Sequence, residues 1–305
     1  MIEISVIIPY YQDLTSIKKC IKSLSEQTLS ENNFEVIIVS NEPTLQAFDF
    51  LNDYKLKISL LHEPNGGSYA ARNLGIKKAK GKHIAFLDSD CLPKEDFLDK
   101  GLKLIREHPV VAGKIELSPI NNIWSKYDKT FYFGQQTYVS RDSYAVTANL
   151  FVQKDIFDKI GPFDAFLHSG GDKEWCSRLR DIKIHYSPEI VVRHPSRNSF
   201  LLILKRRIRI CSSLVYLQLR SGSLSPQHES GRNLFYSKMN LADWICDMEF
   251  FESLTKSDQW KITRIHSLFM KIDKLIFFVG RKNYKLLKSM MLIDKKWRAR
   301  QDSNL

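Results

Sequence analysis

Two aspartates separated by one residue follow a short apolar stretch, and together they have the chemistry of a metal site. The stretch is Lys82-His83-Ile84-Ala85-Phe86-Leu87-Asp88-Ser89-Asp90. Its apolar residues, 84–87, do not alternate with polar ones, which is typical of a strand covered on both faces. Asp88 and Asp90 therefore fall at the carboxyl end of a buried strand, where open α/β sheets bind ligands. Mg²⁺ and Mn²⁺ favour carboxylate oxygens and commonly bridge a carboxylate to a phosphate.

The aspartate pair alone does not establish a site. With 20 aspartates among 305 residues, about one Asp-x-Asp pair is expected by chance. The alternative interpretation is a solvated acidic turn after a strand. The segments that surround the pair must decide between the two.

The elements before this strand alternate between strands and helices. We expect strands at 4–9, 34–39 and 56–61 and helices at about 14–27, 44–53 and 69–80. Asp13 or Thr15 caps the first helix, and Ser68 the third, which Gly81 closes. This alternation predicts a doubly wound α/β sheet whose strand order stays open.

Such a sheet brings the ends of its strands to one crevice. Tyr11 follows the first strand, Ser40 and Asn41 follow the second, and Arg72 lies near the start of the third helix. Together with the two aspartates they combine aromatic, amide, cationic and metal-binding chemistry. That combination suits a nucleoside diphosphate.

Three blocks in this region resemble a known family. They are Ser5-Val6-Ile7-Ile8-Pro9-Tyr10-Tyr11, Asn65-Gly66-Gly67-Ser68-Tyr69-Ala70-Ala71-Arg72-Asn73-Leu74-Gly75, and Phe86-Leu87-Asp88-Ser89-Asp90. In this order and at these separations they are similar to the nucleotide-sugar half of the family-two-type glycosyltransferases with the GT-A fold. Segments 147–151, 160–164, 170–179 and 191–194 continue the resemblance to about residue 198.

The resemblance implies an architecture. We expect an α/β catalytic domain over 1–198, with the Rossmann-like mixed sheet of the GT-A (nucleotide-diphospho-sugar transferase) fold. Residues 1–112 would form its nucleotide-sugar half and 113–198 its acceptor half. Residues 199–305 would be a basic, mainly helical C-terminal extension.

The resemblance also implies roles for individual residues. Asp90 would bind Mn²⁺ or Mg²⁺ together with His194, and Asp88 would either join them or contact the ribose. Residues expected to bind the nucleotide sugar are Pro9, Tyr11, Ser40, Asn41, Arg72 and Asp88, and residues expected on the acceptor side are Asn149, Trp175 and Arg178. For Tyr11, Arg72 and His194, an ordinary structural role is the alternative.

Two carboxylates in 170–179 are the candidate catalytic residues. An acceptor hydroxyl must lose a proton as it attacks, and Asp172 is our candidate base because Gly170 and Gly171 permit a close approach. The alternative for Asp172 is a simple helix cap. Glu174 cannot share its helical face, so we expect it to orient the acceptor or Arg178.

One departure from the family leaves the nucleotide open. The family usually carries an acidic pair and Gly-Ser after its second strand, whereas this chain reads Ser40-Asn41-Glu42-Pro43. Ser40 lacks the charge-assisted contact that a carboxylate makes with a base. Because uridine diphosphate sugars are the commonest donors of the family, the resemblance favours one here.

Residues 113–142 lose the α/β alternation and gather aromatic residues, among them Trp124, Tyr127, Phe131, Tyr132, Phe133 and Tyr138. We expect a long loop. Its aromatic residues would contact sugar faces or a lipid-linked acceptor, or else they would cover the edge of the sheet.

The last third of the chain carries its excess of positive charge. Residues 193–305 hold 22 Lys/Arg against 9 Asp/Glu, whereas 1–192 are nearly neutral. Helices are expected at 200–220, 234–254, 260–279 and 284–297. The segment 201–210 combines apolar residues with Lys205, Arg206, Arg207 and Arg209, which indicates either an anionic membrane surface or a packed helix. A second basic cluster follows at 295–300.

No signal peptide and no apolar stretch long enough to span a bilayer is evident, and the five cysteines are scattered. These features favour reduced thiols and a cytoplasmic protein, peripheral at most at the inner face of the membrane.

The function that we expect is a metal-dependent inverting glycosyltransferase that moves a sugar from a nucleoside-diphosphate sugar to a hydroxyl, in surface-glycan or lipid-linked glycan synthesis. Two alternatives stay open. The first is a noncatalytic nucleotide-sugar-binding relic. The second is a nucleic-acid-binding protein that uses the basic C-terminal region, although no base-stacking or zinc motif supports it.

Overall fold

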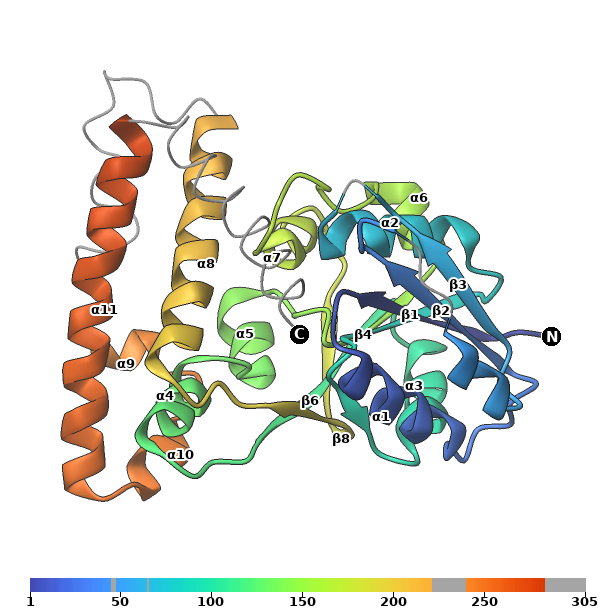
Figure 1. Cartoon of the computed structure of the whole chain (residues 1–305), viewed down its shortest axis with the longest axis horizontal. Coiled ribbons are helices and arrows are strands. Elements are labelled where there is room, and N and C mark those ends of the chain that lie inside the picture. The colour runs from blue at the N-terminus through green and yellow to red at the C-terminus, as the bar shows by residue number, and fades with distance from the viewer. Residues whose placement is uncertain (45–47, 65, 221–239, 283–305) are drawn as a thin grey trace. The chain divides into compact units, whose positions relative to one another are not determined.

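The computed structural model describes residues 1–44, 48–64, 66–220 and 240–282 (Figure 1). The chain divides into two compact units. The first comprises Met1–Ile120 and Phe131–Ser196, and the second comprises Asn121–Thr130 and Arg197–Leu305. The division after residue 196 lies two residues before the predicted boundary. The assignment of 121–130 to the second unit has no counterpart in the sequence pattern.

The first unit is built on an eight-stranded mixed sheet of order β3-β2-β1-β4-β7-β6-β8-β5. Strands β3, β2, β1 and β4 are parallel to one another, and β7 runs antiparallel to both β4 and β6. Their bounds are β1 Ile4–Tyr10, β2 Phe34–Ser40, β3 Ile58–His62, β4 His83–Leu87, β5 Leu92–Pro93, β6 Val110–Ser118, β7 Asn149–Gln153 and β8 Ile184–Pro195. The mixed α/β sheet predicted from the sequence is confirmed.

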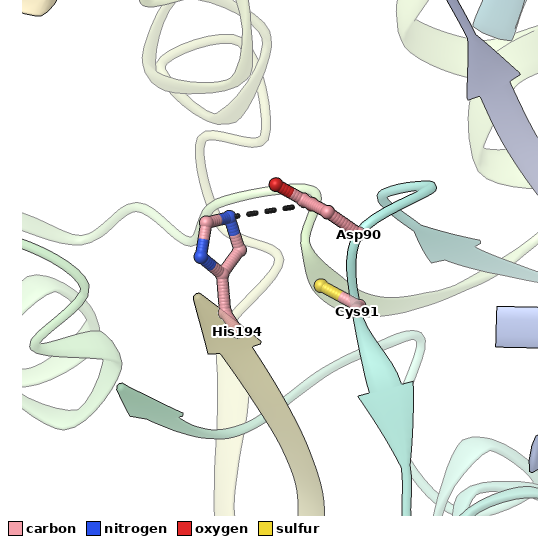
Figure 2. Close-up of side chains that lie close together, drawn as sticks. All are labelled: Asp90, Cys91 and His194. Carbon is pink, nitrogen blue, oxygen red and sulfur yellow. Dashed lines mark ion pairs between the residues drawn. The ribbon is translucent and has the colours of Figure 1, made fainter. Parts of the chain in front are cut away.

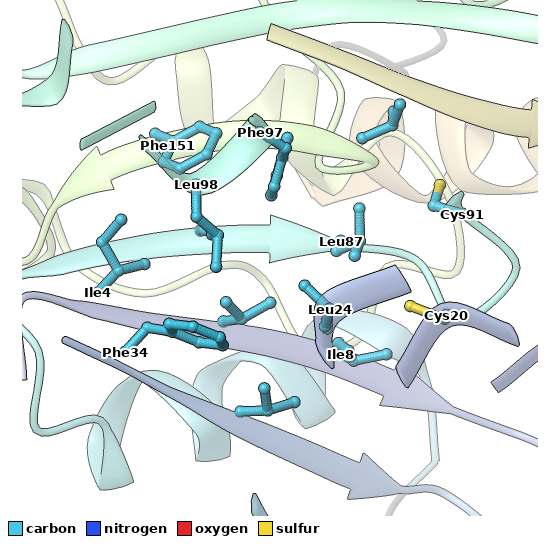
Figure 3. Packing of buried hydrophobic residues seen from close by; sticks show 14 of the residues in the cluster. Ile4, Ile8, Cys20, Leu24, Phe34, Leu87, Cys91, Phe97, Leu98 and Phe151 are labelled. Atoms are coloured by element: carbon cyan, nitrogen blue, oxygen red, sulfur yellow. The ribbon is translucent and has the colours of Figure 1, made fainter. Parts of the chain in front are cut away.

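Helices cover both faces of this sheet. In Figure 1, α1 (Leu14–Ser25) and α3 (Phe97–Ile105) lie on one face, and α2 (Ser68–Lys78) and α6 (Asp155–Ile160) on the other. Alternate residues of β1 therefore enter two different cores: Ile8 packs in the cluster on the α1 side (Figure 3), while Ile7 meets α2. Gly75 permits that contact, because a Cβ there would lie 2.5 Å from Ile7 Cγ2. Burial on both faces explains the unbroken apolar strands.

The helix starts agree with the sequence at one position and differ at another. Asp13 caps α1, accepting a hydrogen bond from the Ser16 backbone N–H at 2.9 Å. Ser68 is not the cap of α2, because Gly67 takes the cap position with φ +102° and Ser68 is already helical. The helix predicted at 44–53 is only a single 3-10 turn, η1 (Asp49–Asp53), within the described residues.

The aromatic stretch at 113–142 is not a loop. It contains the end of β6 and two helices, α4 (Ile123–Phe131) and α5 (Gln135–Asp142). Tyr127 is fully buried against Phe269 of the second unit, and Trp124 packs on Phe200 at 5.6 Å between ring centroids. Trp124 and Tyr127 of α4 therefore pack within the second unit, so they do not form the exposed sugar-binding loop that we expected.

The second unit consists of helices. They are α4, α8 (Phe200–Arg220), α9 (Leu241–Trp244), α10 (Met248–Ser253) and α11 (Lys256–Lys282). Helices α8 and α11 run in the same direction, with Phe200 stacked on Phe269 and Arg207 paired with Asp273 (Figure 1). The single helix predicted at 234–254 is replaced, within the described residues, by short α9 and α10. The predicted helix at 284–297 and the basic cluster at 295–300 lie outside the described residues.

The cations of α8 are not all on its surface. Arg206 is buried in an ion pair with Asp128 of α4, and Arg207 in one with Asp273 of α11. These two of the four cations at 205–209 therefore hold the helices of the second unit together. The interpretation of 201–210 as a basic membrane-facing helix is corrected for them: each guanidinium is neutralised inside the unit.

Among the described helices, none is both long enough and apolar enough to cross a bilayer. All five cysteines are buried free thiols, as their scattered spacing predicts.

Candidate active site

The carboxyl end of β4 carries the first part of the candidate site. Asp88 follows directly after the strand, and its Oδ1 lies 2.5 Å from Nη2 of Arg72 on α2. Arg72 is 3% exposed, and its guanidinium lies over the Tyr69 ring at 5.4 Å. The predicted Arg72 and Asp88 are thus brought together as a largely desolvated ion pair. It fixes the position of both groups at the end of the sheet.

Asp90 faces His194, the next-to-last residue of β8 (Figure 2). Nδ1 of His194 lies 2.8 Å from the Pro195 carbonyl, which can only accept, so Nδ1 carries the proton. In the neutral ring, Nε2 then presents its lone pair to Asp90 Oδ1, 3.5 Å away. Two facing acceptors repel unless a cation lies between them. The arrangement therefore fits a divalent metal, or a second proton on the imidazole.

Cys91 is the third group near this pair. The candidate ligand atoms of Asp90, Cys91 and His194 lie within 4.8 Å of one another, the one such cluster among the described residues. Burial raises the pKa of the Cys91 thiol well above its usual value, and Sγ donates to the Ala148 carbonyl at 3.7 Å. A protonated thiol is a poor ligand for Mg²⁺ or Mn²⁺. The residues that fit the expected metal are Asp90 and His194, while Asp88 is held by Arg72.

Asp172 lies in α7 (Gly171–Cys176). Gly170, in the left-handed region at φ +72°, takes the cap position, so Asp172 is not the helix cap that was the alternative interpretation. Its Oδ1 accepts from the Lys173 backbone N–H at 2.9 Å and from the Tyr69 hydroxyl at 3.3 Å. Burial raises the pKa of Asp172, while the Lys173 N–H, Arg72 and Tyr69 oppose the rise. A raised pKa suits a general base near neutral pH.

Glu174 pairs with Arg178, which was one of the two roles that we expected for it. Its Oε2 lies 3.1 Å from Arg178 Nη2. The same guanidinium donates to the Ile160 carbonyl at 2.6 Å and the Pro162 carbonyl at 2.7 Å. Arg178 therefore joins α7 to the segment after α6. This geometry supports a positioning role for both residues.

The ends of β1 and β2 hold the other predicted nucleotide contacts. Tyr11 and Asn41 are half-buried, and Asn41 Nδ2 donates to the Glu63 carbonyl at 3.0 Å. Pro9 is buried inside β1 beside Val39. Ser40 is 1% exposed, and its hydroxyl accepts from the Glu42 N–H at 3.2 Å. The side chains of Pro9 and Ser40 are both enclosed by their neighbours in this structure.

Two residues that we expected on the acceptor side are likewise buried. Asn149 is fully buried, and its Nδ2 donates to the carbonyls of Lys114 and Ile190 at 2.9 and 3.0 Å. Trp175 is also fully buried, and its indole N–H donates to the Gly161 carbonyl at 3.0 Å. Neither side chain has surface left for an acceptor. Both tie chain segments together behind the site.

Three residues near the site were given no individual role in the sequence analysis. Tyr69 links Arg72 to Asp172, and Phe133 packs its ring on His194 with centroids 4.3 Å apart. Glu42, the first carboxylate after β2, is 7% exposed and accepts from the Gln12 N–H at 3.2 Å. Its position after a strand was a usable signal. Tyr69 gave none, because Asp172 lies 103 residues further along the chain.

Comparison with known proteins adds the family. The model for glycosyl transferase family 2 matches residues 5–169. The glycosyltransferase AglE of Haloferax volcanii is 34% identical over 217 residues, covering 68% of this chain and 71% of AglE. The chain belongs to glycosyl transferase family 2. It is therefore a glycosyltransferase, as the motifs of the first 198 residues predict.

A second similar protein covers less of the sequence. The poly(ribitol-phosphate) beta-N-acetylglucosaminyltransferase TarS of Staphylococcus aureus is 32% identical over 125 residues, 40% of this chain and 22% of TarS. The crystal structure of TarS 1-349 in complex with UDP-GlcNAc matches with a TM-score of 0.53 and 18% identity, covering 92% of each chain. At that identity the likeness shows the fold alone.

Proposed function

We propose that this chain transfers a sugar from a nucleoside-diphosphate sugar to an acceptor hydroxyl in one inverting displacement. The observation that carries the proposal is the link between Asp88, Arg72, Tyr69 and Asp172. It joins the end of β4, where a diphosphate would bind, to a buried carboxylate on α7. A donor side and a proton acceptor thus share one preorganised set of side chains.

On the donor side, we propose that Arg72, Asp88, Tyr11 and Asn41 surround the nucleotide. Arg72 brings the positive charge that a diphosphate requires, and its pairing with Asp88 holds the guanidinium in one orientation. A uridine diphosphate sugar is our proposed donor, because TarS, which shares the fold, was crystallised with UDP and with UDP-GlcNAc. Glu42 takes the place of the acidic group that Ser40 lacks, since it is the buried carboxylate at the end of β2.

Mn²⁺ or Mg²⁺ is the proposed cofactor, with Asp90 and His194 as its protein ligands. Such a cation, when bound, stabilises the negative charge that grows on the leaving diphosphate. The Pro195 carbonyl fixes the tautomer of His194, and the Phe133 ring holds its plane. The chain thus orients the imidazole of His194 before any ligand arrives.

On the acceptor side, Asp172 is the proposed general base. Its carboxylate takes the proton of the attacking hydroxyl, while the Lys173 N–H and the Tyr69 hydroxyl keep Oδ1 in place. We propose that the other oxygen, Oδ2, accepts the proton of the hydroxyl. Glu174 and Arg178 hold α7 against the segment that follows α6. The proposed acceptor class is a glycan or a lipid-linked glycan.

A transfer assay tests this function. The full chain would be incubated with UDP-sugars, Mn²⁺ and hydroxyl acceptors, and free UDP and product would be measured by mass spectrometry. We expect product with the opposite anomeric configuration to the donor, and stabilisation in a thermal-shift screen by UDP with Mn²⁺. Stabilisation by nucleotide sugars without any transfer would instead support the noncatalytic relic. Stabilisation by oligonucleotides alone would support the nucleic-acid-binding alternative.

A further inference from the structure

Helix α11 carries a row of large exposed apolar side chains on one side. Trp260 is 61% exposed, Leu268 49%, Leu275 61% and Phe278 57%. Their separations of eight, seven and three residues place them on one helical face. The opposite face, which includes Phe269 and Asp273, is buried against α4 and α8. The exposed row is therefore not part of the core of the second unit.

Cations fill the gaps in this row. Arg264 and Lys271 lie between the apolar side chains, and Lys261 and Lys274 flank them, all four exposed. The sequence 256–282 holds two acidic residues, Asp258 and Asp273. Asp273 is buried with Arg207, and Asp258 pairs with Lys126 at 2.6 Å. From Trp260 to Phe278, the outward face of α11 thus carries positive charge and no carboxylate.

We propose that this outward face of α11, formed by Trp260, Lys261, Arg264, Leu268, Lys271, Lys274, Leu275 and Phe278, docks on an anionic phospholipid bilayer. Its cations complement anionic headgroups, and their aliphatic stems leave room for neighbouring apolar groups to reach the acyl boundary. Tryptophan is favoured at that interface. The face is about 27 Å long at 1.5 Å per residue, enough to lie along a membrane surface.

Other occupants fit this face less well. A nucleic acid would satisfy the cations through its phosphates, but it would leave the Leu268 and Leu275 side chains in water. A second copy of the chain would place one cationic face against another, because a twofold contact brings the same patch together from both sides. A lipid surface is the partner that satisfies the charges and the aliphatic groups at once.

The site of membrane contact therefore differs from the one that the sequence suggests. Two of the four cations in the basic cluster at 205–209, Arg206 and Arg207, form buried ion pairs with Asp128 and Asp273. Both acids of α11 are also paired within the unit, Asp273 with Arg207 in a buried ion pair and Asp258 with Lys126 in a partly exposed one. The outward face of α11 is therefore left with exposed basic and apolar side chains and no carboxylate.

Liposome flotation of the full chain tests the proposal. Vesicles of phosphatidylcholine alone would be compared with vesicles containing 30% phosphatidylglycerol, at low and high salt. We expect flotation with the anionic vesicles only, weakened by salt. The double variants Leu268→Gln/Leu275→Gln and Arg264→Glu/Lys271→Glu should each lower the partition coefficient roughly tenfold or more.

Matched controls place equivalent changes elsewhere. Leu14→Gln changes an exposed leucine of α1, and Lys77→Glu/Lys78→Glu reverses two exposed lysines of α2. Both should float like the unaltered chain, and circular dichroism should show equal folding of all variants. The assay contains no sugar donor, so its result is independent of the transfer reaction.

Three results would overturn the proposal. The first is unchanged flotation of both α11 variants, and the second is no flotation even at low salt. The third is a loss, in these variants, of oligonucleotide binding or of dimers seen by light scattering, in place of a loss of vesicle binding. A loss of oligonucleotide binding would assign the face to a nucleic acid, and a loss of dimers would assign it to a second copy of the chain.

Discussion

At the scale of single residues, the protonation state of Asp172 depends on opposing effects. Burial raises the pKa of this carboxyl, whereas the Tyr69 hydroxyl and the Arg72 charge lower it. A general base must be ionised before transfer, so activity should rise as pH passes the pKa of Asp172. The hydroxyl of Tyr69 is thus a positioning group that also tunes the base.

The variant Tyr69→Phe tests this role. Loss of the hydroxyl removes a hydrogen bond to the ionised carboxylate, so the pKa of Asp172 should rise. The acidic limb of the kcat/KM profile should then shift to higher pH, while the KM for the donor stays the same. Tyr186→Phe, on β8 beside Ala112, is the control and should leave the profile unchanged. An unshifted profile in Tyr69→Phe would separate Tyr69 from the base.

The variant Asp172→Asn tests the base itself. An amide keeps the size of the side chain but cannot take the proton of the acceptor hydroxyl. Turnover should fall about 10²- to 10⁴-fold, the usual contribution of general base catalysis. Calorimetric titration with UDP should give an unchanged affinity. Turnover equal to that of the unaltered chain would remove Asp172 from the reaction.

Sequence reasoning found the charged groups of the site but not their surroundings. Asp88 and Asp90 were identifiable because a buried strand ends directly before them. Asn149 and Trp175 were assigned to the acceptor although they are buried, because a polar or aromatic residue type does not reveal which way its side chain points. The Tyr69 contact to Asp172 joins helices far apart in sequence, and only the folded chain brings them together.

At the scale of elements, α2 and α7 meet with almost no clearance. A Cβ at Gly171 would lie 2.7 Å from the Tyr69 ring, so α7 can begin there only without a side chain. The start of α7, which positions the proposed base Asp172, thus depends on the contact with Tyr69 of α2. Apolar patterning predicted which segments of the first unit form strands, but this contact is a matter of packing.

Gly171→Ala should separate these two helices. Displacing the Tyr69 ring should cost about 1–3 kcal/mol of unfolding free energy and lower kcat through Asp172. Gly170→Ala is the matched control, because its Cβ would meet nothing within 4 Å and only its φ of +72° is strained. The control should lose about 1 kcal/mol of stability and keep kcat. Urea unfolding and initial rates measure both, and equal rates in both variants would contradict the steric argument.

The helices of the second unit carry a pH-sensitive group in their core. His266 of α11 is 5% exposed, and its Nδ1 lies 3.4 Å from the Tyr127 hydroxyl. Burial, with the Arg207 charge, lowers the pKa of His266 to about 3. The neutral ring is therefore favoured in the folded state. Its contribution to stability is complete above the unfolded pKa of about 6.5 and is lost as pH falls towards 3.

His266→Gln should remove this dependence. At pH 5 the unfolded histidine gains about 2 kcal/mol from protonation that the buried ring does not. The unaltered chain should therefore lose about 2 kcal/mol more than the variant between pH 8 and pH 5. Urea unfolding at the two pH values, followed by circular dichroism, measures the difference. Equal losses in both proteins would mean that His266 is protonated in the folded state.

At the scale of the whole molecule, the basic excess of the last third does not translate directly into a basic surface. Arg206 and Arg207 form buried ion pairs with Asp128 and Asp273 inside the second unit. Removing one partner of such a pair would leave the other charge buried and unpaired. Composition predicted the total charge but not this division, because a sequence does not state which charges are paired.

Ligand linkage connects the site to the stability of the whole chain. A ligand that binds only the folded state adds about 2.7 kcal/mol at a concentration of 100 times its Kd. UDP with Mn²⁺ should therefore raise the thermal midpoint of the unaltered chain more than UDP alone. In Asp90→Ala the increment from Mn²⁺ should disappear, because one of its two proposed ligands is gone, while the effect of UDP alone persists through Arg72. Asp96→Ala, which removes a half-buried carboxylate paired with Lys100, should keep both increments. An Mn²⁺ increment that survives in Asp90→Ala would place the metal on other residues.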